Sequence, residues 1–188
     1  GRPVWSPDGT RIALSARVDP ASPTGDAQPA GRAPAPLVTD RLDYQADGSG
    51  FVGAVRTQVH VVDVVSGRCV VLTDGTGSYG DPAWAPDGTR IVVAAPTGDD
   101  SDLTSASAAF LLDPDLPGGP PTRVGSLAGV GGAVSFTPDG SSLLVVGARD
   151  TAPGHAGLWR LPLGGDDAVD LAAALDRNVM PGGPAYPG

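Results

Sequence analysis

Three segments of the chain repeat one pattern of hydrophobic and polar positions. They read PVWSPDGTRIALSA from Pro3, PAWAPDGTRIVVAA from Pro82 and VSFTPDGSSLLVVG from Val134. In each segment an aromatic residue ends a short apolar stretch and a Pro-Asp-Gly sequence follows. An apolar run of about five to seven residues comes next, which is the usual length of a strand. Each segment therefore predicts a β-hairpin.

The Pro-Asp-Gly letters fit a tight turn between the two strands. Proline pre-sets φ at the second turn position, aspartate bonds to nearby backbone, and glycine adopts the positive φ that turns the chain back. The three aspartates would lie in different repeats, too far apart to share one metal ion. We therefore interpret all nine turn residues as structural: Pro7, Asp8, Gly9, Pro86, Asp87, Gly88, Pro138, Asp139 and Gly140.

The strand after each turn is apolar at both alternating sets of positions. Ile12, Leu14 and Ala16 share one face of the first such strand, and the intervening Ala13 is apolar too. The strands that begin near Ile91 and Leu143 follow the same pattern. Strands that are apolar on both faces are typically covered on both sides, so the pattern predicts sheets stacked face to face.

Two further strand candidates follow each hairpin. They are QVHVVDV (58–64) and CVVLT (69–73), then AAFLLD (108–113) and TRVGSL (122–127), then GLWRLPL (157–163) and AVDLAAAL (168–175). Four short strands per unit, repeated in tandem, are typical of β-propeller blades. The chain is therefore predicted to be all-β, a partial β-propeller of about three four-stranded antiparallel blades.

The blades are expected at residues 1–75, 81–128 and 132–175, with an inter-blade segment at 176–188. The first blade carries an insertion at 17–57. Its front part, 19–37, is expected to be disordered because it has no periodicity and little apolar surface. Propellers close with about four to eight blades. Three blades therefore predict a segment of a longer ring, with apolar faces open at both ends.

The repeats and one further segment resemble a known family. WSPDG-type repeats occur in TolB-like propellers and in the amino-terminal propellers of the prolyl oligopeptidase family of serine peptidases. RLDYQADGSGFVGAVRTQVHVVDVVSG (41–67), with LTDG (72–75) and DPAWAPDG (81–88), is similar to the acylaminoacyl peptidase and dipeptidyl peptidase branch. The tail DRNVMPGGPAYPG (176–188) resembles an inter-blade segment of these peptidases. The resemblance implies a propeller that caps an α/β-hydrolase domain and limits access to short peptides.

The resemblance brings no catalytic residue onto this chain. In the family the chemistry resides in the hydrolase domain, whose nucleophilic serine needs glycine two residues before it and two after it. Ser78 has Gly80 but Thr76, and Ser142 has Gly140 but Leu144. We therefore expect no catalytic residue, no cofactor and no metal. The expected partners are a hydrolase domain outside this chain, the remaining blades and a short peptide substrate.

One polar cluster outside the repeats is a candidate substrate contact. It comprises Arg41, Tyr44, Asp47 and Arg56, in the last part of the insertion. An arginine at the propeller rim could hold a peptide carboxylate through a bidentate pair. The alternative is that Arg41 and Tyr44 only anchor the insertion onto its blade.

Composition narrows the partners and the compartment. The net charge is -9, with twelve arginines and no lysine, so no basic patch for nucleic acid is expected. No apolar stretch approaches the roughly 18 residues of a membrane helix, so no membrane partner is expected. The acidic run 98–102 is interpreted as a solvated turn rather than a calcium site. Cys69 is expected to be buried in its strand, and the single cysteine and the resemblance favour the cytoplasm.

Two functions follow from these observations. The first is a propeller segment of a serine peptidase acting on short peptides, which gates substrate and packs against the catalytic domain without activity of its own. The alternative is a TolB-like propeller that binds protein partners and has no enzymatic activity. The sequence after Gly188 discriminates between them, because a nucleophile elbow followed by Asp and His would indicate the peptidase.

Overall fold

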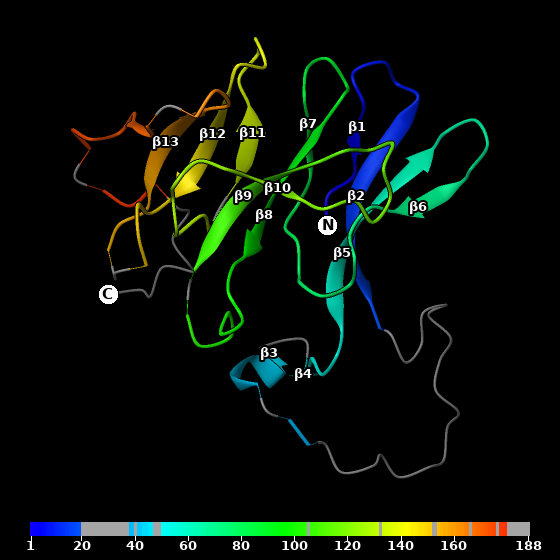
Figure 1. Cartoon of the computed structure of the whole chain (residues 1–188), viewed down its shortest axis with the longest axis horizontal. Helices are drawn as coiled ribbons and strands as arrows, with labels where there is room; N and C mark the ends of the chain where they lie inside the picture. Colours follow the sequence, from blue (N-terminus) through cyan, green and yellow to red (C-terminus); the bar gives the residue numbers. More distant parts are fainter. Residues whose placement is uncertain are drawn as a thin grey trace, which may run out of the picture.

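Three four-stranded antiparallel sheets stand side by side in the computed structural model (Figure 1). It describes residues 1–19, 38–39, 41–46, 50–104, 106–131, 133–151, 154–165, 167–175 and 177–179. Nearly all of the segment expected to be disordered, and most of the tail at 176–188, lie outside these residues. The predicted fold class, an all-β partial propeller of three four-stranded blades, is confirmed.

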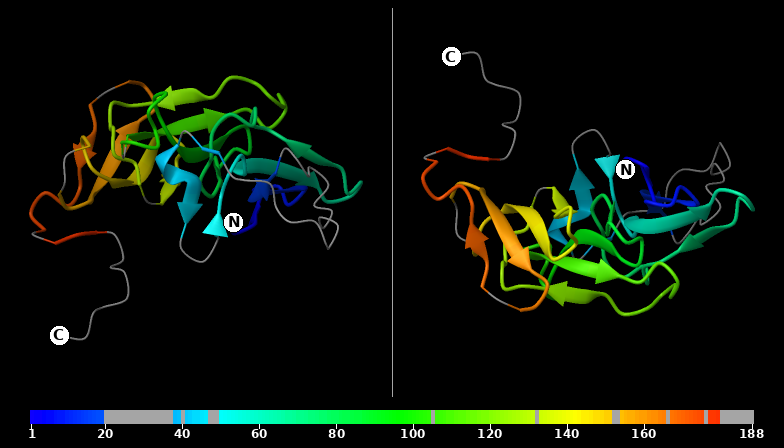
Figure 2. Two further views of the ribbon diagram at one scale, coloured as in Figure 1. Left: turned by 90° about the horizontal axis from the view of Figure 1, so that it is seen from below. Right: turned by 90° about the horizontal axis from the view of Figure 1, so that it is seen from above.

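Each sheet is one blade, and its strands follow one another in chain order. Blade 1 contains β1 (Val4–Trp5), β2 (Arg11–Val18), β5 (Arg56–Asp63) and β6 (Cys69–Val71). Blade 2 contains β7 (Ala83–Trp84), β8 (Ile91–Pro96), β9 (Ser107–Leu112) and β10 (Thr122–Val124). Blade 3 contains β11 (Val134–Phe136), β12 (Ser142–Gly147), β13 (Gly157–Pro162) and β14 (Val169–Asp170). The first strands β1, β7 and β11 lie next to one another, and Figure 2 shows the three sheets following one another along the molecule.

The insertion of blade 1 forms a small module of its own between β2 and β5. It contains a one-turn 3₁₀ helix, η1 (Leu42–Tyr44), and the antiparallel pair β3 (Gln45–Ala46) and β4 (Gly50–Phe51). This module lies at one end of the blades, in the lower part of Figure 1. It is the part of the described chain that breaks the repeat.

The core lies between the blades, and strand β8 shows how it is divided. Ile91, Val93 and Ala95 pack in a cluster with residues of blade 1, whereas Val92 packs in a second cluster with residues of blade 3. Ile91, Val92 and Val93 are all fully buried. The interpretation that strands apolar on both faces lie between stacked sheets is therefore confirmed.

The three hairpin corners share one geometry. The φ angles of Gly9, Gly88 and Gly140 are 71°, 72° and 70°. In the first corner the Gly9 amide donates to the Ser6 carbonyl at 2.9 Å, and the other two corners make the same bond. This is a four-residue turn that ends on a left-handed glycine, a conformation that a residue with a side chain rarely adopts.

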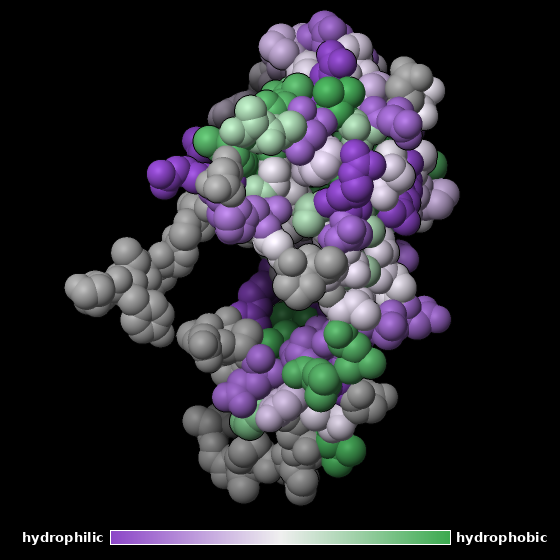
Figure 3. Space-filling view, turned by 90° about the vertical axis from the view of Figure 1, so that its left-hand side faces the viewer, coloured by the Kyte–Doolittle hydropathy of each residue, from purple (hydrophilic) through white to green (hydrophobic). Residues whose placement is uncertain are grey.

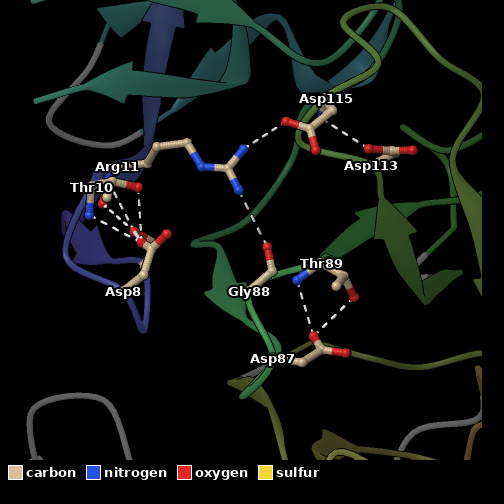
Figure 4. Close-up of polar contacts among 9 residues, drawn as sticks. Asp8, Thr10, Arg11, Asp87, Gly88, Thr89, Asp113 and Asp115 are labelled. Atoms are coloured by element: carbon tan, nitrogen blue, oxygen red, sulfur yellow. Dashed lines mark hydrogen bonds and ion pairs between the residues drawn. The ribbon is translucent and has the colours of Figure 1, made fainter.

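The aspartate of each corner accepts local hydrogen bonds that hold its carboxylate ionised. Asp8 accepts from the Ser6 hydroxyl at 2.6 Å and from the Thr10 amide and hydroxyl at 3.0 and 2.9 Å. These donors lower the pKa of Asp8 to about 2, with the Ser6 hydroxyl as the largest cause. Figure 4 shows the first two corners side by side.

The second corner lacks one of these donors. Ala85 occupies the place of Ser6, so among the described residues the donors to the Asp87 carboxylate are the Thr89 amide and hydroxyl, at 3.0 and 2.9 Å. The pKa of Asp87 is lowered chiefly by those two bonds. In the third corner the Thr137 hydroxyl donates to the Asp139 carboxylate, as Ser6 does to Asp8, and the pKa of Asp139 is lowered to about 2. One hydroxyl therefore distinguishes corners that are otherwise alike.

Two local expectations were wrong. The strand expected at 168–175 is only Val169–Asp170. The Asp170 carboxylate accepts the Ala172 amide at 2.8 Å, and the Leu175 amide bonds to the Ala172 carbonyl, so the chain turns away from the sheet. Cys69, expected to be buried, is exposed, because β6 is the edge strand of blade 1.

Candidate functional site

A pocket of about 370 Å³ lies where the insertion meets blades 1 and 2. Arg41 and Asp43 of the insertion and Arg56 at the start of β5 contribute one part of its lining. The link between the blades contributes residues 76–79, and blade 2 contributes Asp99, among others. Figure 3 shows a recess between the blades, above, and the insertion, below.

The insertion is held in place by its own pairing and by one bond to blade 2. The Tyr44 ring stacks on the Phe51 ring, with centroids 6.2 Å apart, and the Val52 amide donates to the Tyr44 carbonyl. The Leu42 amide donates to Oδ2 of Asp102 at 2.8 Å. Asp102 belongs to the acidic run interpreted as a turn, and that run forms the loop between β8 and β9.

Arg41 is paired within the insertion. Its Nε and one terminal nitrogen donate to the two carboxylate oxygens of Asp43 at 2.8 and 2.9 Å. This bidentate bond is the largest cause that lowers the pKa of Asp43, and the charges of Arg41 and Arg56 add to it. The ion pair neutralises the charge of Arg41 and fixes the orientation of its side chain in the wall of the pocket.

Arg56 is the second arginine of the pocket, and backbone carbonyls hold its side chain in place. One terminal nitrogen of its guanidinium donates to the backbone carbonyls of Gly53 and Val55, both at 2.9 Å. Among the described residues Arg56 has no carboxylate partner within ion-pair distance. The charge of Arg56 also lowers the pKa of nearby Asp43, but the two side chains form no ion pair, so the guanidinium keeps N–H donors for a ligand.

The structure brings two of the four predicted site residues together. Arg41 and Arg56 line the same pocket. Tyr44 does not line it and instead stacks on Phe51. Asp47 lies outside the described residues. Sequence reasoning missed Asp43, although an acid two residues after Arg41 was a readable signal for an ion pair.

Hydroxyl groups complete the polar lining. Oγ of Ser78 accepts a hydrogen bond from the Thr57 amide at 3.2 Å, which leaves its proton free to donate. Thr76 and Ser101 also line the pocket, but the Thr76 hydroxyl already donates to Asp74 at 2.8 Å. A guanidinium beside the Ser78 hydroxyl suits an anionic oxygen ligand. No group of three acidic, histidine or cysteine side chains placed to bind a metal occurs among the described residues.

A polar contact that was not foreseen from the sequence joins blade 1 to blade 2. The Arg11 guanidinium lies over the Trp84 ring, 5.0 Å from its centroid. It donates to Asp115 at 2.8 Å and to the Gly88 carbonyl at 3.4 Å, as Figure 4 shows. We name Arg11, Trp84 and Asp115 the blade clamp. The Thr-Arg pair that follows the turn in both of the first two repeats was the sequence signal for this contact.

The edge of the Trp84 ring makes a further contact with blade 1. Nε1 of Trp84 donates to the backbone carbonyl of Val4 at 3.2 Å. Trp84 is thus bonded to the inner strand of blade 1 at its edge and covered by Arg11 on its face. Both contacts cross from one blade to the next.

Sequence comparison gives one informative relative. No protein-family profile matches the chain. The uncharacterized peptidase YuxL of Bacillus subtilis is 29% identical over 112 residues, which cover 59% of this chain and 17% of that protein. The chain thus spans about a sixth of the length of the curated relative it matches. No helix in the described ranges is long and apolar enough to cross a membrane.

The fold is shared with many solved structures, including a peptidase, TolB and a protease propeller domain. Acylaminoacyl peptidase of Pyrococcus horikoshii matches 94% of this chain and 26% of its own, at 17% identity and a TM-score of 0.62. TolB of Acinetobacter baumannii matches 91% of this chain and 31% of its own, at 18% identity and a TM-score of 0.57. The β-propeller domain of the Trilobed protease from Pyrococcus furiosus matches 90% of this chain and 40% of its own, at 12% identity and a TM-score of 0.50.

These likenesses agree with the resemblance read from the repeats and from residues 41–67. The relative is a peptidase, and the solved structures include peptidases and a protease propeller domain. The chain is a three-bladed β-propeller segment that resembles the propeller segments of prolyl oligopeptidase family peptidases.

Proposed function

We propose that the chain is the propeller segment of a serine peptidase that acts on short peptides, and that the pocket of Arg41 and Arg56 gates the substrate by holding its carboxylate. One observation carries the proposal. Arg56 presents a guanidinium without a carboxylate partner among the described residues, in a pocket of about 370 Å³. The similarity of the chain to peptidases supports placing this pocket in the propeller of a peptidase.

The chemistry of the proposed contact is a charge-assisted pair. A peptide carboxylate would accept two parallel N–H bonds from Nε and the second terminal nitrogen of Arg56, because the first terminal nitrogen donates both its hydrogens to the Gly53 and Val55 carbonyls. The Ser78 hydroxyl, which already accepts from the Thr57 amide, would donate a further bond. Arg41 is held by Asp43 and would shape the pocket rather than bind. Asp99 lines the same pocket and would disfavour a second anionic group.

Bond cleavage would take place elsewhere. We assign it to a Ser-Asp-His mechanism on a hydrolase domain that packs against the propeller. This chain would then restrict access to that domain and orient short substrates. A peptide whose carboxylate is masked would lose the contact with Arg56.

A titration tests the pocket directly. Calorimetry would compare N-acetylated tripeptides that carry either a free carboxylate or a carboxamide. We expect the free acid to bind and the amide to bind at least about tenfold more weakly, because the loss of a charged hydrogen bond is worth about 1.5–3 kcal/mol. Arg56→Gln should remove the difference, while Arg160→Gln, at an exposed arginine of blade 3, should keep it. Equal binding of acid and amide would contradict the proposal.

A second assay tests the assignment of chemistry. The chain would be incubated with chromogenic peptide substrates, with and without a serine-directed fluorophosphonate. We expect no turnover. Turnover that the fluorophosphonate blocks would show that this chain carries its own nucleophile.

The alternative is a TolB-like propeller that binds protein partners without catalysis. It is favoured by the fold shared with TolB of Acinetobacter baumannii. The two functions differ in the sequence that follows Gly188. A nucleophile elbow with later Asp and His would support the peptidase, and a stop after one or two more blades would support the binding module.

A further inference from the structure

Gln58 is a buried amide that the other two blades do not have. Its exposed fraction is 2%. The strand registers give the same position to Ala108 in blade 2 and to Gly157 in blade 3. Burying an amide costs free energy unless its hydrogen bonds are replaced. The repeat therefore forms without a polar group at this position, and Gln58 is a feature of blade 1 alone.

The Gln58 amide makes four hydrogen bonds, three of them to the link between blades 1 and 2. This link runs from 72 to 82, between β6 and β7. Oε1 of Gln58 accepts the Thr73 hydroxyl at 2.5 Å and the Gly75 amide at 3.0 Å. Nε2 donates to the Gly77 carbonyl at 2.7 Å and to the Thr57 carbonyl at 3.2 Å. One side chain thus binds three alternate residues of the link.

The link between blades 2 and 3 is held by a backbone bond instead. There the Ser107 amide donates to the Ala128 carbonyl at 2.9 Å. At the same place in blade 1 the Thr57 amide donates to the Ser78 hydroxyl oxygen at 3.2 Å. Gly77 and Ser78 both line the pocket of Arg41 and Arg56. Side chains therefore replace a backbone bond in the part of the link that forms the pocket wall.

The bond from Gln58 to the Gly77 carbonyl sets the direction of the next amide. In a trans peptide the N–H points opposite to the C=O of the same peptide group, so the Ser78 N–H points away from Gln58. None of the described residues accepts a hydrogen bond from this N–H. The Ser78 hydroxyl proton is also available, because its oxygen accepts from the Thr57 amide. Ser78 therefore has two donors for a ligand.

We propose that Gln58 is a positioning residue of the pocket, and that it aims the Ser78 amide and hydroxyl at the carboxylate held by Arg56. The inference rests on the proposed function, because it takes the same peptide carboxylate as the ligand. Donors that are fixed before the ligand arrives bind an anionic oxygen better than mobile ones. The carboxylate would accept from one residue on β5 and one on the link. A carboxamide, with one acceptor oxygen, would satisfy fewer of these donors.

Amide NMR of the full chain tests the proposal. An N-acetylated tripeptide with a free carboxylate is added, and its carboxamide form is the reference ligand. We expect the Ser78 amide proton to move downfield and to saturate with the acid, and to move little with the carboxamide. Binding of the acid without a shift of the Ser78 amide would overturn the proposal, and this measurement needs no variant.

Removing the Gln58 amide tests the positioning itself. Gln58→Ala gives blade 1 the residue that blade 2 has at this position. The acid should bind it about threefold to tenfold more weakly, the value of one hydrogen bond, and most of the Ser78 amide shift should be lost. If this variant does not fold, Gln58→Met keeps the length of the side chain without its amide and should give the same losses. Unaltered affinity and an unaltered Ser78 shift in a folded variant would refute the role of Gln58.

A matched variant of the same strand separates positioning from a general loss of stability. Val61 is also buried in β5, but it pairs with Val70 of β6 and does not contact the pocket. Val61→Ala should destabilise blade 1 and leave both the acid affinity and the Ser78 shift unchanged. Equal losses of affinity in Val61→Ala and Gln58→Ala would show that Gln58 acts through stability alone.

The same titrations distinguish a failure of this inference from a failure of the proposed function. If the pocket does not hold a carboxylate, the unaltered chain shows no preference for the acid over the carboxamide. If the preference is present, is lost in Arg56→Gln and is unchanged in Gln58→Ala, the proposed function stands and only the role of Gln58 is refuted.

Discussion

Blades 1 and 2 have nearly the same sequence in their first two strands and very different surroundings. Ile91 of blade 2 is fully buried, whereas its counterpart Ile12 in blade 1 is only half-buried. The turn, the register and the apolar pattern are the same in both blades. The burial of a propeller strand is therefore set by its neighbouring blade. The strand's own sequence supplies only the apolar side chains that such a neighbour can cover.

The largest expected effect comes from truncating the two matched isoleucines. Ile91→Ala should lower the free energy of unfolding by about 2–5 kcal/mol, because it leaves a cavity between two packed sheets. Ile12→Ala should cost much less, since its side chain already meets solvent. Urea denaturation of both variants measures the difference. Equal losses would show that neighbouring blades do not determine the burial.

Removing the arginine of the blade clamp should have the next largest effect. Arg11→Gln loses the contact with the Trp84 ring and the ion pair with Asp115, whose side chain is 80% exposed. We expect a loss of about 1–2 kcal/mol, mostly from the ring contact, because exposed ion pairs contribute little. Arg90→Gln is the matched control from the second repeat. A smaller loss for Arg11→Gln than for this control would refute the assigned role.

Acid should weaken the first and third corners more than the second. The pKa values of Asp8 and Asp139 are depressed to about 2 in the folded chain. A depressed pKa contributes stability that is fully present above the unfolded value of about 4 and is lost as the pH falls toward 2. Asp8→Asn should therefore flatten the stability profile between about pH 4 and 2 more than Asp87→Asn. The reverse order, measured by denaturation across pH, would contradict the geometry of the corners.

The smallest expected effect is a gain. Ala85→Ser restores at the second corner the hydroxyl that Ser6 supplies to Asp8. The pKa of Asp87 should fall toward the value of about 2 found for Asp8, and stability at neutral pH should rise slightly. Carboxyl carbon chemical shifts followed through an acid titration measure this pKa. An unchanged pKa would mean that the hydroxyl is not what separates the corners.

The repeat was predictable because its information is local. The Pro-Asp-Gly corners and the apolar runs depend on residues next to one another, and they led to the three sheets. The errors concerned residues whose surroundings depend on their place in the sheet. Cys69 was predicted to be buried because its neighbours in the strand are apolar, but that strand lies at the edge of its sheet. The last strand was predicted to be too long, because the Asp170 carboxylate accepts the Ala172 amide and ends β14.

The candidate site was only half predictable. Arg41 and Arg56 stood out as arginines in a segment unlike the repeats, and both line the pocket. Ser78 and Asp99 come from the blade link and from blade 2, so only the folded chain brings them to the same place. The blade clamp was missed for the same reason, since Arg11 and Trp84 meet across two blades.

The central claim is that Arg56 is the anion contact of the pocket, and the side-chain Nε–H signals of the arginines test it most directly. These signals would be followed by NMR while an N-acetylated tripeptide with a free carboxylate is added. We predict a saturable shift of the Arg56 signal, a smaller one for Arg41, and none for Arg160 on blade 3. An unmoved Arg56 signal, or the same shift with the carboxamide peptide, would contradict the claim.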